Sequence, residues 1–236
     1  MPFIFLDDPY RWSKGLHRFT EVFGRAFRHR IFAAIENGSD QEVLNLASKR
    51  VLVRSKNEWG SSPLVAAIAM NRSVLVSQFI QRGGMLVGDG SIAQAAMRGH
   101  IEIVATLLDA DKNSNEPLHD DDDDDDGNTH CRGYTPLMWA VNRKYIPIVR
   151  CLLEAGADVN AVAANGSTAV MLTRDADSFS LEALELLCSY SADLTTKDSR
   201  GRNIIREARD RWINSGWPEM MEIIKRHHPN TDFDAV

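Results

Sequence analysis

The sequence predicts an all-α protein built as a solenoid, in which short helix pairs stack in chain order. Two observations carry this prediction. A turn led by glycine returns at nearly constant intervals, since Gly133 and Gly166 are 33 positions apart and Gly166 and Gly201 are 35 positions apart. Small residues and then paired apolar residues follow each turn at helical spacing. Such a period is typical of stacked repeats.

The composition is that of a soluble folded protein, with 236 residues of which 44% are hydrophobic and 25% charged. The net charge is −6, and seven consecutive aspartates, Asp120 to Asp126, account for more than all of it. Without them the net charge would be +1. The chain is therefore nearly neutral with one concentrated anionic stretch, and we expect no nucleic-acid partner.

Cysteine usage indicates a reducing compartment, and the apolar runs are too short to indicate a membrane-spanning segment. The three cysteines, Cys131, Cys151 and Cys188, are few and widely spaced, which fits a reducing compartment. No apolar run approaches the roughly 20 residues that cross a bilayer. The opening residues have no basic region and too short an apolar stretch for a secretory signal.

The N-terminal segment, residues 1–29, has a basic amphipathic pattern. Leu16, Phe19, Phe23 and Phe27 recur at helical spacing among six lysines and arginines between Arg11 and Arg30. We expect a helix that caps the exposed end of the first repeat, because an end repeat has no neighbour on its outer side. The alternative is contact with a membrane or with a partner's groove.

One repeat unit can be followed residue by residue. Thr135 is placed to cap a helix whose first residue is Pro136, and Ser62 with Pro63 repeats the device. A first helix with small residues follows, such as Ala95 and Ala96. The second helix carries an apolar face, which in the fourth unit consists of Ile148, Val149, Leu152 and Leu153. A glycine then ends this helix, Gly83 in the second unit and Gly156 in the fourth.

These residues resemble the ankyrin repeat, whose signature includes T-P-L-x-x-A and a period near 33. The match includes Thr135-Pro136-Leu137, Ala140 and LLEAGADVNA from Leu152, and also AAMRGH from Ala95. The resemblance implies an ankyrin-repeat domain over residues 30–228 and a tail at 229–236. The expected units lie near 30–56, 57–84, 85–110, 130–161, 162–196 and 197–228, with an insertion at 111–129.

Two units depart from the signature, which makes their boundaries harder to place. The fifth has Ala169 where proline is expected and about two extra residues near its middle. The sixth has Asn203-Ile204-Ile205 in place of T-P-L.

The aspartate run contains part of a metal-binding pattern. Asp122, Asp124, Asp126 and Gly127 match the start of a calcium loop, but its twelfth position, which should be glutamate, falls on Gly133. His119, His130 and Cys131 do not have a zinc spacing. We therefore expect no metal, no cofactor and no catalytic residues. The alternative is a cation-regulated switch, or an enzyme that uses the aspartates of this loop.

The resemblance also implies where a partner binds, because members of the family usually bind through the turn tips and the inner helices. Trp59 and Tyr134 are candidate aromatic anchors, although either ring could instead pack on its own neighbour. Recurring arginines favour an acidic ligand if they line one groove, or form a solvated face if they do not. The full candidate set is Trp59, Met70, Arg98, Arg132, Tyr134, Asn142, Arg143, Arg200 and Arg202.

The expected function is that of a non-enzymatic scaffold or adaptor that binds a protein or peptide on the concave ankyrin surface, as a monomer. The acidic residues Asp120, Asp121, Asp122, Asp123, Asp124, Asp125 and Asp126 are candidate regulatory residues. They could mask the basic groove, recruit a basic partner or serve only as a linker. The resemblance implies a cytoplasmic location, with a nuclear one as an alternative. A bacterial effector that acts on a host protein through the same surface, in the cytosol of the host cell, also fits.

Overall fold

The computed structural model describes residues 30–57, 60–84, 90–110, 113–117, 131–174, 180–206 and 217–229. These residues form α-helices and a 3-10 helix, and no strand occurs among them. The predicted all-α class is confirmed. The described residues divide into two compact units, one with helices α2 to α5 and the other with α6 to α12. The expected N-terminal cap lies outside the described residues.

The first unit opens with a helical stretch at residues 30–37. It continues with α2 (Asp40–Leu46), α3 (Lys49–Arg54), α4 (Pro63–Ala69) and α5 (Ser73–Gln81). Helix α3 is an addition to the expected helix pair. It forms because the Ser48 hydroxyl accepts the Val51 N–H at 3.3 Å and because Leu52 is fully buried.

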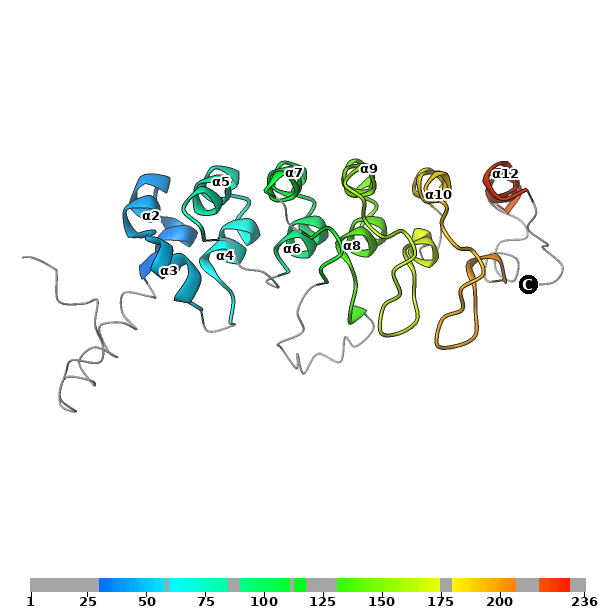
Figure 1. Cartoon of the computed structure of the whole chain (residues 1–236), viewed down its shortest axis with the longest axis horizontal. Coiled ribbons are helices and arrows are strands. Elements are labelled where there is room, and N and C mark those ends of the chain that lie inside the picture. The colour runs from blue at the N-terminus through cyan, green and yellow to red at the C-terminus, as the bar shows by residue number, and fades with distance from the viewer. Residues whose placement is uncertain are drawn as a thin grey trace, which may run out of the picture. The chain divides into compact units, whose positions relative to one another are not determined.

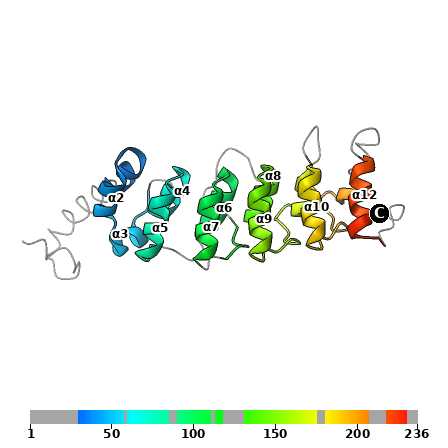
Figure 2. The same ribbon diagram turned by 90° about the horizontal axis from the view of Figure 1, so that it is seen from above.

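The second unit consists of α6 (Ser91–Arg98), α7 (Ile101–Asp109), α8 (Pro136–Asn142), α9 (Ile146–Glu154), η4 (Ala169–Thr173), α10 (Leu181–Ser189) and α12 (Trp217–His227). Helices α7, α9, α10 and α12 form an outer row, and α6, α8 and η4 form an inner row (Figure 1). Seen from above, the outer helices lie side by side in chain order (Figure 2). Each layer contacts the next, as the repeat predicts.

Apolar side chains fill the space between the layers. The four apolar residues predicted for the outer helix of the fourth repeat, Ile148, Val149, Leu152 and Leu153, are all buried. Ala95 and Ala96 of α6 are fully buried as well. Since alanine adds little bulk, α6 and α8 can pack closely.

Helix starts follow the sequence signature where it is intact and change where it is broken. The hydroxyls of Ser62 and Thr135 each accept the backbone N–H three residues on, at 3.3 Å. In the fifth repeat, the buried Thr168 hydroxyl has no hydrogen-bond partner, and Ala169 opens a 3-10 helix instead of an α-helix. In the sixth, the Asn203 side chain accepts the Arg206 N–H at 2.8 Å and restores the cap.

Candidate functional site

The hairpin tips before the inner helices are built alike in the fifth and sixth repeats. The Ala163 N–H donates to the Ser167 carbonyl at 2.9 Å, and the Asp198 N–H donates to the Arg202 carbonyl at 2.8 Å. The glycine inside each tip adopts a left-handed conformation, with φ of 80° at Gly166. A side chain there would place its Cβ only 2.9 Å from the Ser199 nitrogen, so the close approach of the next tip requires glycine.

Backbone hydrogen bonds join successive tips into a ladder. The Ala164 N–H donates to the Arg132 carbonyl, and the Ser199 N–H donates to the Asn165 carbonyl, each at 3.1 Å. Arg132, Asn165 and Arg200 therefore occupy the same position, directly before the tip glycine, in three successive repeats. We call these three residues the tip row. The side chains of Arg132 and Arg200 are exposed.

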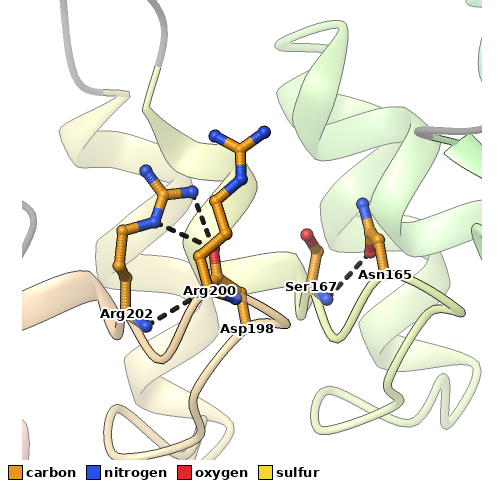
Figure 3. A network of polar contacts seen from close by, with 5 residues as sticks. All are labelled: Asn165, Ser167, Asp198, Arg200 and Arg202. Atoms are coloured by element: carbon orange, nitrogen blue, oxygen red, sulfur yellow. Dashed lines mark hydrogen bonds and ion pairs between the residues drawn. The ribbon is translucent and has the colours of Figure 1, made fainter.

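The two later tips are held by different side chains (Figure 3). The Asp198 carboxylate accepts the backbone N–H groups of Arg200 and Arg202, both at 2.9 Å, and the Arg202 guanidinium at 2.7 Å. In the fifth repeat, where alanine stands at the aspartate's position, the Asn165 side chain accepts the Ser167 N–H at 2.9 Å. Arg202, a candidate for partner binding, is thus tied into its own tip.

The pKa of the Asp198 carboxyl lies below its ordinary value. Partial burial acts to raise this pKa, but the hydrogen bonds and the charge of Arg202, together with the Arg200 N–H, act more strongly in the opposite direction. The carboxylate is therefore charged at neutral pH and holds the tip together.

Tyr134 does not provide the exposed anchor that the sequence suggested. Its side chain is 5% exposed, and its ring meets Trp139 edge to face with centroids 5.3 Å apart. Burial raises the pKa of the Tyr134 phenol and Cys131 acts in the same direction, against hydrogen bonds with Asn165 and Ser167. Tyr134 therefore belongs to the interior between two repeats, which was the alternative interpretation.

The predicted arginines lie in two rows rather than one. Arg132 and Arg200 precede inner helices, whereas Arg98 ends α6 and Arg143 directly follows α8. Because α8 has seven residues, its two ends are about 10 Å apart. Asn142 is exposed at the last position of α8. The arginines therefore do not all lie at the same end of the inner helices, as one groove lined by the whole set at that end would require.

The remaining candidate residues are a methionine in the first unit, a tryptophan and the aspartate run. Met70 is 50% exposed at the end of α4, a position equivalent to Arg98 and Arg143. Trp59 and Asp120 to Asp126 lie outside the described residues.

Residues 113–117 belong to the repeat, although the sequence assigned them to an insertion. The Asn113 side chain accepts the Asn115 N–H at 3.0 Å, just as Asp158 accepts the Asn160 N–H at 2.9 Å. Across to the next repeat, the Asp158 N–H donates to the Asn115 side chain at 2.6 Å. The signal was present in the sequence, since N-S-N at 113–115 stands where D-V-N stands at 158–160.

Asn160 makes the same connection one repeat further along. Its side-chain oxygen accepts the Asp193 N–H at 2.7 Å, and its amide nitrogen donates to the Ser191 carbonyl at 3.3 Å. Glu116 adds a contact of its own, because its carboxylate accepts the Gly90 N–H at 3.2 Å in front of α6. The loop thereby supplies an acceptor for the backbone N–H of the glycine that precedes α6.

Burial raises the pKa of the two cysteines on the outer helices, Cys151 and Cys188, which disfavours their reactive thiolate forms. Cys188 is buried, and burial, with Glu185 acting in the same direction, raises its pKa to about 11. Burial also raises the pKa of Cys151. Among the described residues, no group of three or more His, Cys, Asp or Glu side chains is placed to hold a metal ion. The described helices are also too short or too polar to cross a membrane.

Comparisons with known proteins point to one family. Residues 92–198 match the family model for ankyrin repeats in three copies. The ankyrin repeat and KH domain-containing protein mask of Drosophila melanogaster is 33% identical over 113 residues, which are 48% of this chain and 2% of that protein. The ankyrin repeat and SAM domain-containing protein 6 of Rattus norvegicus is 35% identical over 122 residues, which are 49% of this chain and 12% of that protein. The chain thus spans a small part of these relatives.

A solved structure has the same fold. An ankyrin repeat domain from Acinetobacter baumannii AYE superposes with a TM-score of 0.68 at 22% identity, covering 84% of this chain and 97% of that one. The resemblance inferred from the residues is confirmed.

Proposed function

This chain is an ankyrin-repeat protein, and we propose that it works as a non-enzymatic scaffold that binds another protein or a peptide through its tip row. Ankyrin repeats are generally protein–protein interaction modules. The protein acts as a cytoplasmic monomer in this proposal.

The observation that carries the proposal is the ladder between the tips. Backbone bonds fix the spacing of Arg132, Asn165 and Arg200, while the two arginine side chains remain exposed. Preorganised positions lower the entropy cost of binding, because the partner meets a surface that is already ordered. Arginine also pairs with carboxylates through two parallel hydrogen bonds, which favours a partner with acidic residues.

Affinity capture with the intact chain tests the proposal. The double variant Arg132→Glu, Arg200→Glu should lose the proteins that the wild type retains from a lysate. Arg150→Glu is the matched control, because Arg150 is an exposed arginine on the outer helix α9. Bound proteins are identified by mass spectrometry and then tested as purified partners. Equal retention by the wild type and the tip variant would contradict the proposal.

The aspartate run regulates this surface in our proposal. It ends at Asp126, only a few residues before Arg132, and its charge can compete with an acidic partner for the tip arginines. Deleting residues 118–127 should strengthen binding to an acidic partner. The deletion must start after 117, since Asn115 and Glu116 hold the neighbouring repeats. Unchanged or weaker binding would reject masking.

A further inference from the structure

The turns that join the two helices of the third and fourth repeats lie against each other. They comprise residues 98–102 and 143–147. Gly99 has φ of 82°, and a Cβ built there would lie 2.7 Å from Cζ of Tyr145. The Tyr145 ring therefore covers the Gly99 backbone, and the two turns form one continuous surface, which we call the turn edge.

The turn edge is cationic in a chain that is nearly neutral apart from its aspartate run. It contains Arg98, Arg143 and Lys144 against the single carboxylate of Glu102, a net charge of +2, whereas the whole chain has −6. All three cations are exposed. With the Gln94 amide oriented so that its oxygen faces Arg98, that oxygen accepts Nε at 2.8 Å and Nη2 at 3.1 Å, so a neutral group steadies the guanidinium.

His100 adds no charge to the turn edge at neutral pH. Burial lowers the pKa of His100 below its usual value, and the charge of Arg98 lowers it further.

Two apolar side chains lie among these cations. Ile101 is 41% exposed and Tyr145 is 36% exposed. One face of the Tyr145 ring is covered by Gly99, which orients the ring, and part of its remaining surface is exposed. Tyrosine and arginine are the residue types that most often anchor protein interfaces, because each combines apolar area with polar recognition.

We propose that the turn edge is a second docking surface, which binds an acidic segment of a partner protein that also carries aliphatic or aromatic residues. Carboxylates pair with Arg98 and Arg143, and an apolar side chain packs against Tyr145 and Ile101. Charge complementarity and the exposed apolar pair both select this occupant. The surface is independent of the tip row, because it lies at the opposite ends of the inner helices.

Selection from a random peptide library on the immobilised full chain tests this inference. Peptides that bind should be enriched in Asp and Glu beside Leu, Phe or Tyr. A fluorescein-labelled selected peptide should bind the double variant Arg98→Glu, Arg143→Glu about tenfold more weakly, because each reversal turns an attraction into a repulsion. Arg150→Glu and the tip variant Arg132→Glu, Arg200→Glu should bind it like the wild type. Circular dichroism establishes that each variant is folded.

Any of four outcomes would overturn the inference. One is a set of selected peptides without acidic residues, and another is undiminished binding of acidic peptides by the Arg98, Arg143 variant. The third is binding to phosphatidylserine vesicles that this variant loses while peptide binding persists, which would make the edge a lipid-binding surface. Loss of the peptide only in the tip variant would favour the tip row and exclude the turn edge.

Discussion

The side-chain oxygen of Asn115 accepts a hydrogen bond from the backbone N–H of Asp158 at 2.6 Å, and it thereby links the loops of two successive repeats. Asn160 provides the corresponding link to Asp193 in the following repeat. Residues 113–117, in the loop after the third repeat, therefore contribute to the contact between the third and fourth repeats.

Replacing Asn115 with alanine should lower the free energy of unfolding by about 1 kcal/mol, because one hydrogen bond across repeats is lost. Asn160→Ala should cost more, since Asn160 also donates to the Ser191 carbonyl. Urea unfolding of the full chain measures both. Asn142→Ala serves as the control at an exposed position, and an equal loss in all three variants would contradict this account.

Truncating Tyr134 to alanine should destabilise the protein by about 3 kcal/mol, a loss typical of a buried aromatic residue. Tyr134→Phe keeps the packing against Trp139 and gives up only the hydrogen bonds with Asn165 and Ser167, so it should cost about 1 kcal/mol. Thermal and urea unfolding compare the two. Were Tyr134 an exposed anchor, the alanine variant would unfold like the wild type and lose only partner binding.

Gly99 and Gly156 form a matched pair with similar backbone angles, φ of 82° and 80°. Gly156→Ala should cost about 1 kcal/mol, because a Cβ there meets nothing within 4 Å and only the backbone conformation is unfavourable. Gly99→Ala should cost clearly more, since its Cβ would meet the Tyr145 ring. Equal unfolding midpoints in urea would show that the ring moves aside freely.

The lowered pKa of Asp198 predicts a specific loss of stability in acid. A carboxyl group whose pKa is lower in the folded than in the unfolded state contributes stability above the unfolded value, about 3.9 for aspartate. That contribution disappears as the pH falls through the folded pKa. Asp198→Asn should therefore be less stable than the wild type at pH 7, and the difference should shrink below about pH 4. Glu182→Gln, an exposed change on α10, is the control; a difference that persists unchanged in acid would contradict the assignment.

The sequence predicted the parts of the fold that depend on local signals. Ser62 and Thr135 cap the helices they were expected to cap, because the capping bond spans only three residues. The apolar face of α9 is buried as its spacing required. The fifth repeat differs because Ala169 lacks the fixed backbone angle of proline, and the pattern alone did not show that a 3-10 helix would result.

Features that depend on contacts between repeats were harder to predict. Whether Tyr134 points outward or inward is decided by Trp139, Asn165 and Ser167, and the last two belong to the next repeat. The division of the arginines into two rows depends on the bounds of the inner helices, because these bounds decide at which end of a helix each arginine lies. The sequence pattern does not fix the bounds closely enough to show this. Asn115 was missed because its loop ends in residues unlike the family signature.

Two anchored positions flank the aspartate run in the chain. Asn115 and Glu116 precede it, and the tip that begins with Cys131 follows it. Asn115 and Glu116 already hydrogen-bond to the backbone of the neighbouring repeats. The number of residues in the stretch from Leu118 to His130 can therefore change while these anchoring contacts persist, provided that the acidic charge which we propose to regulate the tip row is retained. For the same reason this stretch is a suitable place to graft an epitope or a fluorescent reporter when a biosensor is built from this protein.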